Sequence, residues 1–387
     1  MAGAIALPRL MRVGGGASQE LAAVLAQLGL SKPLIVTDAY LVKSGRVETL
    51  VDGLTKAGIT SRVFADTVPD PTVASIVTGL EFLKGGDHDC VIGFGGGSPL
   101  DSAKAIAVMG MDKAKKISDY KVPHVQDAPG LPIIAIPTTA GTGSEATRFT
   151  IITDEVSDEK MLCPGVAYLP IAALVDYELT MTKPKRLTAD TAIDSLTHAI
   201  EAYVSKRANG FSDQMALSAM RLIAPNLRKV FNDGSDKAGR EALMLGATMA
   251  GVAFSNASVA LVHGMSRPIG AHFHVPHGLS NAMLLPAVTA YSAPAALHRY
   301  ADSARAMGVA SEAEGDQSAV ARLLDELTAI NNELEVPTPK GYGIDEAKWR
   351  SLMPTMATQA LASGSPGNNP RVPTTDEILE IYNQVWN

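Results

Sequence analysis

Apolar residues recur with two different periods along the chain, and the change of period divides it into two parts. From about residue 20 to 140, helical patterns alternate with short apolar runs such as "PLIVTD", "DCVIGFGGG" and "PIIAIPTT". Short apolar strands that alternate with helices and end in Gly, Asp or Thr are typical of a parallel sheet covered by helices. The first part is therefore predicted to be an α/β domain, with ligands at the carboxyl ends of its strands.

Beyond about residue 184 strand-like runs become scarce. Ala, Leu and Met recur at helical spacing in "DQMALSAMRLIAPNLRKVF" and "EALMLGATMAGVAFSNASVALVHGM". Pro184 ends the preceding pattern, and Thr188 is predicted to be the N-cap of the helix that follows. A chain of 387 residues is longer than a domain built on a single hydrophobic core usually is. We therefore expect an α/β domain over residues 1–183 and an all-helical domain over residues 184–387.

Composition narrows the class of function. No apolar run reaches the roughly 20 residues that a membrane helix needs, and we expect no membrane partner. The formal charge of −7, without a long basic block, argues against a nucleic-acid partner. Cys90 and Cys163 form no paired motif, which fits a reducing compartment, so we expect the cytoplasm. The N-terminal "MAGAIALPRLMRVGGG" is too short in its apolar region for a secretory signal and is interpreted as the first strand.

A glycine-rich turn is the first candidate site. The turn in "VIGFGGGSPLDSAKAIAVM" consists of Gly95, Gly96, Gly97 and Ser98. It joins a strand to a helix expected to begin near Pro99 or Leu100, so its backbone N–H groups can approach an anion at a helix N-terminus. The sequence is neither GxGxxG nor a P-loop. A tight turn that needs glycine only for its geometry explains the same pattern.

Two further strand ends carry polar groups. The loop "IPTTAGTGSEATRF" supplies the hydroxyls of Thr138, Thr139, Thr142 and Ser144. Hydroxyls in such a loop can bond phosphate or ribose oxygens, although they also commonly cap turns. Asp38 closes "PLIVTD", and a carboxylate there can accept both ribose hydroxyls and repel a 2′-phosphate, which favours NAD over NADP. The alternative role of Asp38 is a helix N-cap.

The helical part carries ionisable residues at helical spacing. In "DSLTHAIEAY", Asp194 and His198 lie one turn apart among apolar neighbours. A buried carboxylate needs a partner, which is either a metal ion or the imidazole itself. The stretch "LVHGMSRPIGAHFHVPHG" adds four of the eight histidines: His263, His272, His274 and His277. Imidazoles with one carboxylate suit Fe(II), Zn(II), Mn(II) or Ni(II), but composition does not choose among the four histidines.

Four motifs together resemble the iron-containing (group III) alcohol dehydrogenase family. They are "GGGSPLDSAKAIAV", "PTTAGTGSEATRFTIITDE", "DSLTHAIEAYVS" and "HGMSRPIGAHFHVPHG", and the resemblance runs from about residue 5 to the C-terminal "EILEIYNQVW". It implies a dehydroquinate synthase-like fold, with a dinucleotide-binding α/β domain, a helical metal domain and a cleft between them. It also implies a homodimer and metal-dependent hydride transfer between NAD and a small primary alcohol or diol.

The resemblance also implies roles for individual residues. Its metal ligands fall on Asp194, His198, His263 and His277. Its cofactor contacts fall on Asp38, Gly95, Gly96, Gly97, Ser98, Asp101, Thr138, Thr139, Thr142 and Lys160. The implied metal is Fe(II), with Zn, Mn or Ni as alternatives. His263 and His277 count as catalytic residues too, because the ion would polarise the substrate oxygen.

Arg267 departs from the family pattern. Many relatives have "HGMAHPLG" where this chain has "HGMSRPIG", so Arg267 replaces a histidine with an assigned proton-transfer role. Arginine keeps its proton, which leaves His272, His274 or solvent for that task. Arg267 could instead pair with a carboxylate, sulfonate or phosphonate on the substrate, or with cofactor phosphates or a domain-interface carboxylate.

Three other functions stay open at this point. One is reduction of an anionic aldehyde through Arg267. A second is a glycerol-dehydrogenase-like or dehydroquinate-synthase-like enzyme, although "DSLTH" and "HVPHG" speak against these metal-ligand patterns. The third is a non-catalytic sensor that binds NAD and metal.

Overall fold

The computed structural model describes residues 4–111, 115–157 and 159–387. The chain divides into two compact units, an N-terminal unit (Met1–Thr182) and a C-terminal unit (Lys183–Asn387).

The N-terminal unit contains a six-stranded sheet in the order β1-β8-β5-β4-β2-β3, and all its strand pairs are parallel. Its strands are β1 (Leu10–Val13), β2 (Pro33–Val36), β3 (Arg62–Phe64), β4 (Cys90–Gly95), β5 (Ile133–Pro137) and β8 (Ala172–Val175). The chain runs from β2 outward to β3 and then returns past β2 to β4. The loops that follow β2 and β4 therefore flank the point where strand order reverses, which is where ligands bind in open α/β sheets.

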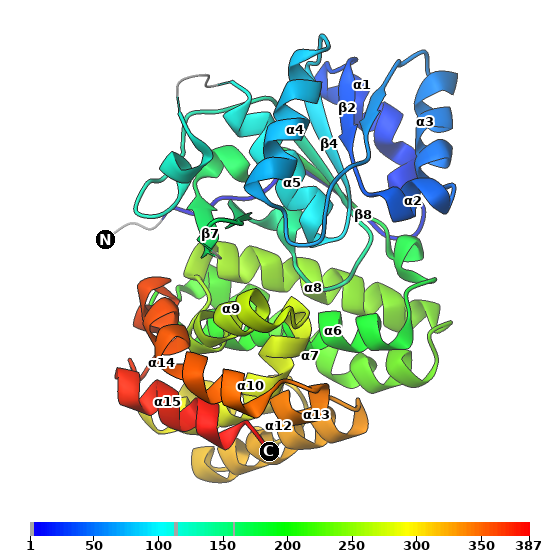
Figure 1. The fold of residues 1–387 in the computed structure, drawn as a ribbon. Helices are drawn as coiled ribbons and strands as arrows, with labels where there is room; N and C mark the ends of the chain where they lie inside the picture. The colour runs from blue at the N-terminus through cyan, green and yellow to red at the C-terminus, as the bar shows by residue number, and fades with distance from the viewer. Residues whose placement is uncertain (1–3, 112–114, 158) are drawn as a thin grey trace. The chain divides into compact units, whose positions relative to one another are not determined.

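Helices cover both faces of this sheet (Figure 1). They are α1 (Leu21–Leu28), α2 (Ala39–Lys43), α3 (Arg46–Lys56), α4 (Val73–Lys84) and α5 (Gly97–Met109). Leu34 and Val36 of β2 pack in one core with residues of α4 and α5, whereas Ile35 packs in a second core with residues of α1 and α3. Because successive strand residues face opposite sides, burial of both faces requires a continuous apolar run such as "PLIV". The predicted α/β architecture is confirmed.

The sequence patterns missed one feature of this unit. Strands β6 (Phe149–Asp154) and β7 (Glu159–Pro164) form a separate antiparallel pair. Short 3-10 helices complete the unit: η1 (Ala17–Glu20), η2 (Ile117–Tyr120), η3 (Ser144–Ala146), η4 (Val166–Tyr168) and η5 (Tyr177–Thr180). Helix α5 also begins at Gly97, slightly earlier than expected, because Pro99 is tolerated in a first turn where its missing N–H would have no helical partner.

The C-terminal unit, every residue of which the structure describes, is helical and has no strand. Its α-helices are α6 (Lys185–Val204), α7 (Gly210–Asn232), α8 (Lys237–Ala257), α9 (Leu261–Phe273), α10 (His277–Ser292), α11 (Leu297–Ala306), α12 (Asp316–Glu333), α13 (Pro339–Tyr342), α14 (Glu346–Ala362) and α15 (Thr375–Gln384). Two 3-10 helices, η6 (Ala293–Ala295) and η7 (Ser365–Asn368), accompany them. The predicted all-helical second half is confirmed.

Helix α6 is the central helix of this unit, because every residue from 192 to 205 is buried. A helix that is buried on all sides has no solvent face for charged residues, so its ionisable side chains need partners inside the protein. The predicted N-cap of α6 was wrong: the cap is Pro184, and the Thr188 hydroxyl instead accepts a hydrogen bond from Arg240.

Among the described residues, no single helix has the length and apolar character to cross a bilayer. Helices α8 and α9 reach that length and composition only when taken together, and they are bent by 105° relative to each other.

Candidate functional site

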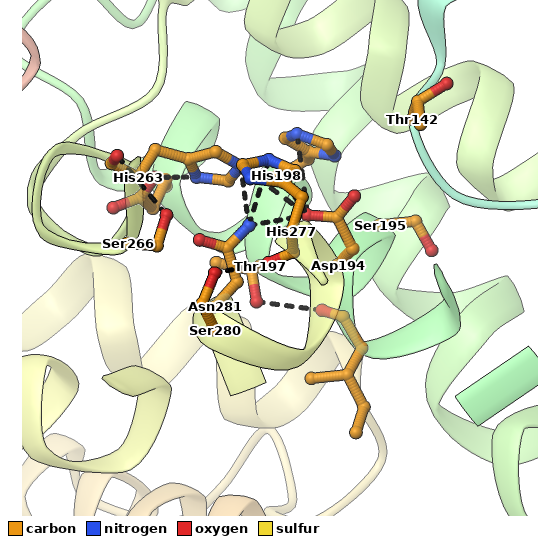
Figure 2. A network of polar contacts seen from close by, with 12 residues as sticks. Thr142, Asp194, Ser195, Thr197, His198, His263, Ser266, His277, Ser280 and Asn281 are labelled. Carbon is orange, nitrogen blue, oxygen red and sulfur yellow. Dashed lines mark hydrogen bonds and ion pairs between the residues drawn. The ribbon is translucent and has the colours of Figure 1, made fainter. Parts of the chain in front are cut away.

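One carboxylate and three imidazoles converge inside the C-terminal unit (Figure 2). Helix α6 supplies Asp194 and His198, α9 supplies His263, and His277 is the first residue of α10. One ligand atom from each of the four lies within 4.8 Å of all the others. Asp194 Oδ1 is 3.9 Å from His198 Nε2, 3.6 Å from His263 Nε2 and 3.8 Å from His277 Nε2.

These separations suit a shared metal ion. Four atoms arranged tetrahedrally at about 2.1 Å from one ion are roughly 3.4 Å apart, close to the distances from Asp194. Asp194, His198 and His263 are buried. A set of three imidazoles and one carboxylate is also the chemistry expected for a divalent transition metal. The residues present therefore fit the metal that the motifs implied.

Two glycines let the histidine-bearing helices approach their neighbours. A Cβ on Gly278, which follows His277, would lie 2.4 Å from the backbone oxygen of Asp190 in α6. A Cβ on Gly264, which follows His263, would lie 2.7 Å from Pro366 Cδ in η7. Real Cβ atoms do not approach other atoms so closely, so each His-Gly pair combines a ligand with the close packing that positions it.

Glu201 holds His263 in place. Its carboxylate is buried, and it accepts hydrogen bonds from the backbone N–H groups of Ala260 (3.0 Å) and Val262 (2.5 Å). His263 Nδ1 donates to the same carboxylate at 2.6 Å. Because the Nδ1 proton is bonded to Glu201, the Nε2 lone pair of His263 is left for the ligand cluster. The sequence motifs gave Glu201 no role; the available signal was a third ionisable residue in "DSLTHAIEAY".

Electrostatics in the cluster favour a charged carboxylate. Burial alone would raise the pKa of Asp194, but the nearby imidazoles of His198, His277 and His263 outweigh it and hold this pKa well below its usual range. Burial lowers the pKa of His263, whereas Glu201 and Asp194 raise it, and the balance is a raised pKa. Negative potential from two carboxylates therefore surrounds His263, as a cation site requires.

His198 has a further constraint on its ring. Its imidazole stacks on Phe254 of α8, with ring centroids 4.3 Å apart and planes 21° apart. Stacking of this kind fixes the plane of the ring without using a ring nitrogen. Phe254 was not predicted, because an aromatic residue in an apolar helix carries no distinguishing pattern.

Arg267 lies one turn after His263 on α9 and is only 9% exposed. Its Nη1 donates to Ser365 Oγ at 3.0 Å, and its Nε has no partner among the described residues. Within the C-terminal unit Arg267 forms no ion pair with a carboxylate, and its salt bridge at the domain interface stays a prediction. Burial lowers the pKa of Arg267 to about 10, while Glu201 acts in the opposite direction.

Neither His272 nor His274 belongs to the four-residue cluster. His272 Nε2 lies 2.9 Å from Gln359 Oε1. His274 is exposed and ends α9 in the left-handed conformation, with φ of 55°. The structure thus resolves which histidines converge, a choice that composition left open.

The glycine-rich turn follows β4 at the carboxyl edge of the sheet, beside the threonine loop that follows β5. Thr138 N donates to Gly95 O at 2.8 Å, which joins the two loops. A Cβ on Gly97 would lie 2.9 Å from Thr142 Cγ2, and one on Gly95 would lie 2.5 Å from Pro99 Cγ. Glycine is therefore needed here for close packing, as the geometric interpretation held.

The same turn also has unused hydrogen-bonding groups. Helix α5 begins without a side-chain cap, so N–H groups of its first turn have no helical or side-chain acceptor. The buried hydroxyl of Thr138 has no partner within the described residues. Free donors at a helix N-terminus beside a buried hydroxyl fit a phosphate group. Gly96 and Thr139, also predicted to contact the cofactor, lie next to each other here.

The predicted carboxylates of this site have structural partners. Asp38 caps α2, because its Oδ1 accepts from Leu41 N at 2.8 Å. Asp101 accepts from Ser144 Oγ at 2.8 Å and from Ile151 N at 3.0 Å, which ties α5 to the threonine loop and to β6. Burial raises the pKa of Asp101, and the charge of Lys104 only partly offsets it.

Lys160 and Ser98 are linked through a residue that the motifs did not identify. Lys160 Nζ forms an ion pair with Asp70 Oδ1 at 2.9 Å, and Asp70 N donates to Ser98 Oγ at 3.2 Å. Asp70 has φ of 52°, in the left-handed region. The only sequence signal was its position before Pro71, because Asp-Pro favours a turn.

A second buried charge lies in α5. Lys104 is fully buried, and its Nζ donates to Thr147 O (3.1 Å), Thr147 Oγ1 (2.9 Å) and Phe149 O (2.9 Å). Burial lowers the pKa of Lys104 to about 8, with the charges of Asp101 and Glu145 opposing the shift. Protein groups thus satisfy this ammonium completely.

Comparison with known proteins gives a family match for each of the two units. The family described as "Iron-containing alcohol dehydrogenase" matches residues 8–177, and the "Fe-containing alcohol dehydrogenase family, C-terminal" matches residues 188–386. The chain belongs to the iron-containing alcohol dehydrogenase family. It is therefore an oxidoreductase, as the four motifs predicted.

Individual relatives are similar over nearly the whole chain. Long-chain-alcohol dehydrogenase 1 of Geobacillus thermodenitrificans is 40% identical over 352 residues, covering 90% of this chain and 88% of the relative. NAD-dependent methanol dehydrogenase of Bacillus methanolicus is 35% identical over 375 residues, covering 97% of each. The crystal structure of a 1,3-propanediol oxidoreductase superposes with a TM-score of 0.94 at 33% identity, covering 100% of both chains.

Proposed function

We propose that this protein interconverts a primary alcohol or diol and the corresponding aldehyde, with NAD as hydride acceptor and a divalent metal at the cluster. The observation that carries the proposal is the convergence of Asp194, His198, His263 and His277 within 4.8 Å. The relatives support the substrate class, because their names specify long-chain alcohols, methanol and 1,3-propanediol. The substrates in these three names are neutral.

The metal is proposed to be Fe(II), held by Asp194, His198, His263 and His277, and the same donors are compatible with Zn, Mn or Ni. When bound, such an ion supplies Lewis-acid polarisation of a substrate oxygen. The protein contributes preorganisation: Glu201 fixes the tautomer of His263, and Phe254 fixes the ring plane of His198.

The N-terminal unit is proposed to bind NAD, which accepts a hydride at its nicotinamide ring. The first-turn N–H groups of α5 and the Thr138 hydroxyl are the proposed pyrophosphate contacts. Asp38 uses one carboxylate oxygen for the helix cap, which leaves the other for a ribose hydroxyl and supports NAD over NADP. Thr139, Thr142 and Lys160 remain predicted contacts at the same edge.

Alcohol oxidation releases one hydride to the cofactor and one proton. Arg267 is not the proton acceptor, because a guanidinium has no free lone pair to bind one. His274, which is exposed, or solvent is proposed to take the proton. We further expect the enzyme to act in the cytoplasm. We also expect it to form a homodimer, and size-exclusion chromatography with light scattering would test this oligomeric state.

An anaerobic assay tests the proposal. Protein stripped with a chelator and reloaded separately with Fe(II) or Zn(II) is mixed with NADH and a series of neutral and anionic aldehydes. We expect metal-dependent NADH oxidation with short neutral aldehydes and faster turnover with NADH than with NADPH. Absence of turnover with every metal and aldehyde, despite NAD binding, would contradict the enzyme assignment, and a strong preference for acidic aldehydes would assign Arg267 to the substrate.

A further inference from the structure

Asn281 lies at the ligand cluster but was not among its predicted members. It is on α10, one turn after His277, and is fully buried. Its Nδ2 is 2.7 Å from Asp194 Oδ1, 3.1 Å from His263 Nε2 and 3.3 Å from His277 Nε2. Figure 2 shows the amide nitrogen facing these side chains. Its Oδ1 is buried and has no hydrogen-bond partner among the described residues.

The arrangement has a simple electrostatic basis. The three neighbouring atoms lie at acceptor distances from this amide nitrogen, and His263 Nε2 is free to accept because the Nδ1 proton of His263 is bonded to Glu201. An amide N–H group is the end of the Asn281 side chain that matches acceptors. A divalent cation among the same three atoms reverses that preference, because it repels the N–H dipole and attracts the carbonyl oxygen.

The side chain can meet this change without backbone movement. Rotation by half a turn about the Cβ–Cγ bond exchanges the nitrogen and oxygen of an asparagine amide, and this terminal torsion is soft. The rotation would bring the partnerless Oδ1 to the position near Asp194, His263 and His277 that Nδ2 occupies.

We propose that Asn281 is a fifth protein ligand of the metal, through its amide Oδ1. The proposal rests on the proposed function, because it presupposes that Asp194, His198, His263 and His277 hold a cation. A neutral oxygen ligand adds no charge to the cluster but raises its coordination number. Zn(II) is usually four-coordinate in proteins, whereas Fe(II) and Mn(II) take five or six ligands, so Asn281 favours the latter ions.

Cobalt substitution tests the coordination number directly. Four-coordinate Co(II) has visible bands several-fold more intense than five- or six-coordinate Co(II), and the spectrum is independent of turnover. We expect weak bands for the wild type and stronger bands for Asn281→Leu, which keeps the side-chain size but has no donor. Chelator competition should show Mn(II) binding weakened roughly 10- to 100-fold in this variant, with Zn(II) binding changed less than about threefold.

Asn281→Asp provides a second, independent measurement. A carboxylate has oxygen at either end, so this variant should keep the weak Co(II) bands and bind Mn(II) at least as tightly as the wild type. If instead the N–H group is the contact that matters, the new carboxylate would repel Asp194, and Mn(II) binding would weaken. That result, or an Asn281→Leu variant with wild-type spectrum and Mn(II)/Zn(II) ratio, would overturn the proposal.

A control separates this inference from the proposed function. Asp194→Ala should lose Co(II) binding whatever the role of Asn281. If the wild type binds no cation, or if Asp194→Ala binds it equally well, both the metal centre and the fifth ligand are wrong. If binding depends on Asp194 but not on Asn281, only the fifth ligand is wrong. Thermal unfolding of each variant verifies that it is folded.

Discussion

Each unit buries a cluster of charged side chains, but the two clusters are neutralised differently. In the N-terminal unit, the Lys104 ammonium has three acceptors supplied by the protein and lies near the charges of Asp101 and Glu145. In the C-terminal unit, Asp194 faces three imidazole nitrogens at 3.6–3.9 Å, distances longer than hydrogen bonds. The first cluster carries its own cation, whereas the second has the geometry of a site completed by one from outside.

The comparison shows how a structural charge and a functional charge differ. Structural burial of an ion requires that every polar atom finds a partner within the fold. A functional cluster leaves donor atoms converging on a point, and surrounding groups such as Glu201 orient them. Both clusters contain aspartate on a helix, so burial of the aspartate alone does not distinguish them.

The largest expected effect comes from Asp194→Ala. Removal of the only carboxylate of the four-residue cluster should abolish metal binding and lower turnover by more than about a hundredfold, because several kcal/mol of charge stabilisation depend on the ion. Calorimetry with NAD should give an affinity within threefold of the wild type. Parallel loss of metal and NAD binding would mean that the cluster stabilises the whole fold.

Lys104→Met tests the buried charge cluster of the N-terminal unit. Loss of the ammonium leaves Asp101, Glu145 and the Thr147 acceptors without their cation, and removal of one partner of a buried charge cluster typically costs about 3–5 kcal/mol. Urea unfolding measures the change in free energy. Lys84→Met, at an exposed position near the end of α4, is the matched control and should be nearly neutral. An effect of Lys104→Met no larger than the control would show that the buried charge is not needed.

The pH dependence of stability provides a second measurement of the contribution of Lys104. The pKa of Lys104 is lowered from 10.5 to about 8, so between these values the unfolded chain binds more protons than the folded protein. The free energy of unfolding contributed by this residue therefore rises with pH from about 8 to 10.5, by up to roughly 3 kcal/mol. Relative to Lys104→Met, the wild type should gain stability over this window in urea titrations. A constant difference would contradict the lowered pKa.

Glu201→Gln should have the smallest of these effects. Glutamine removes the charge and cannot accept hydrogen bonds at both ends, so His263 loses part of its orientation. Substitution of such an orienting residue typically weakens metal binding 10- to 100-fold, which chelator competition would measure. Glu241→Gln, exposed on α8, is the matched control. Metal affinity equal to that of the control would show that backbone packing alone positions His263.

Local sequence was sufficient for the features that depend on spacing. The i, i+4 separation of Asp194 and His198 predicted one shared helix face, and the crowding of histidines predicted a second group of donors. The glycine-rich turn and threonine loop were found because both follow strands of one parallel sheet. In each case the relevant geometry is set by residues close in sequence or by a general rule of the fold.

Partners that meet only through tertiary packing were not predictable in this way. Glu201 bonds the backbone N–H groups of Ala260 and Val262, and nothing in a helical pattern indicates that distant pair. In the sequence, Lys104 resembles any lysine on a helix. Its burial depends on β6, which supplies the Phe149 carbonyl and was not predicted. Arg267 donates to the Ser365 hydroxyl, a partner 98 residues away that no local pattern indicates.

The backbone contact at Gly278 has a consequence for which ions the cluster admits. Because the first turn of α10 lies directly against the Asp190 carbonyl of α6, the backbones that carry His277 and Asp194 are packed close together. Main-chain atoms in packed helices cannot change rotamer to widen a site. Calcium, which takes oxygen ligands at about 2.3–2.6 Å, would have to push the two helices apart. The absence of a side chain at Gly278 thus favours ions with short metal–ligand distances.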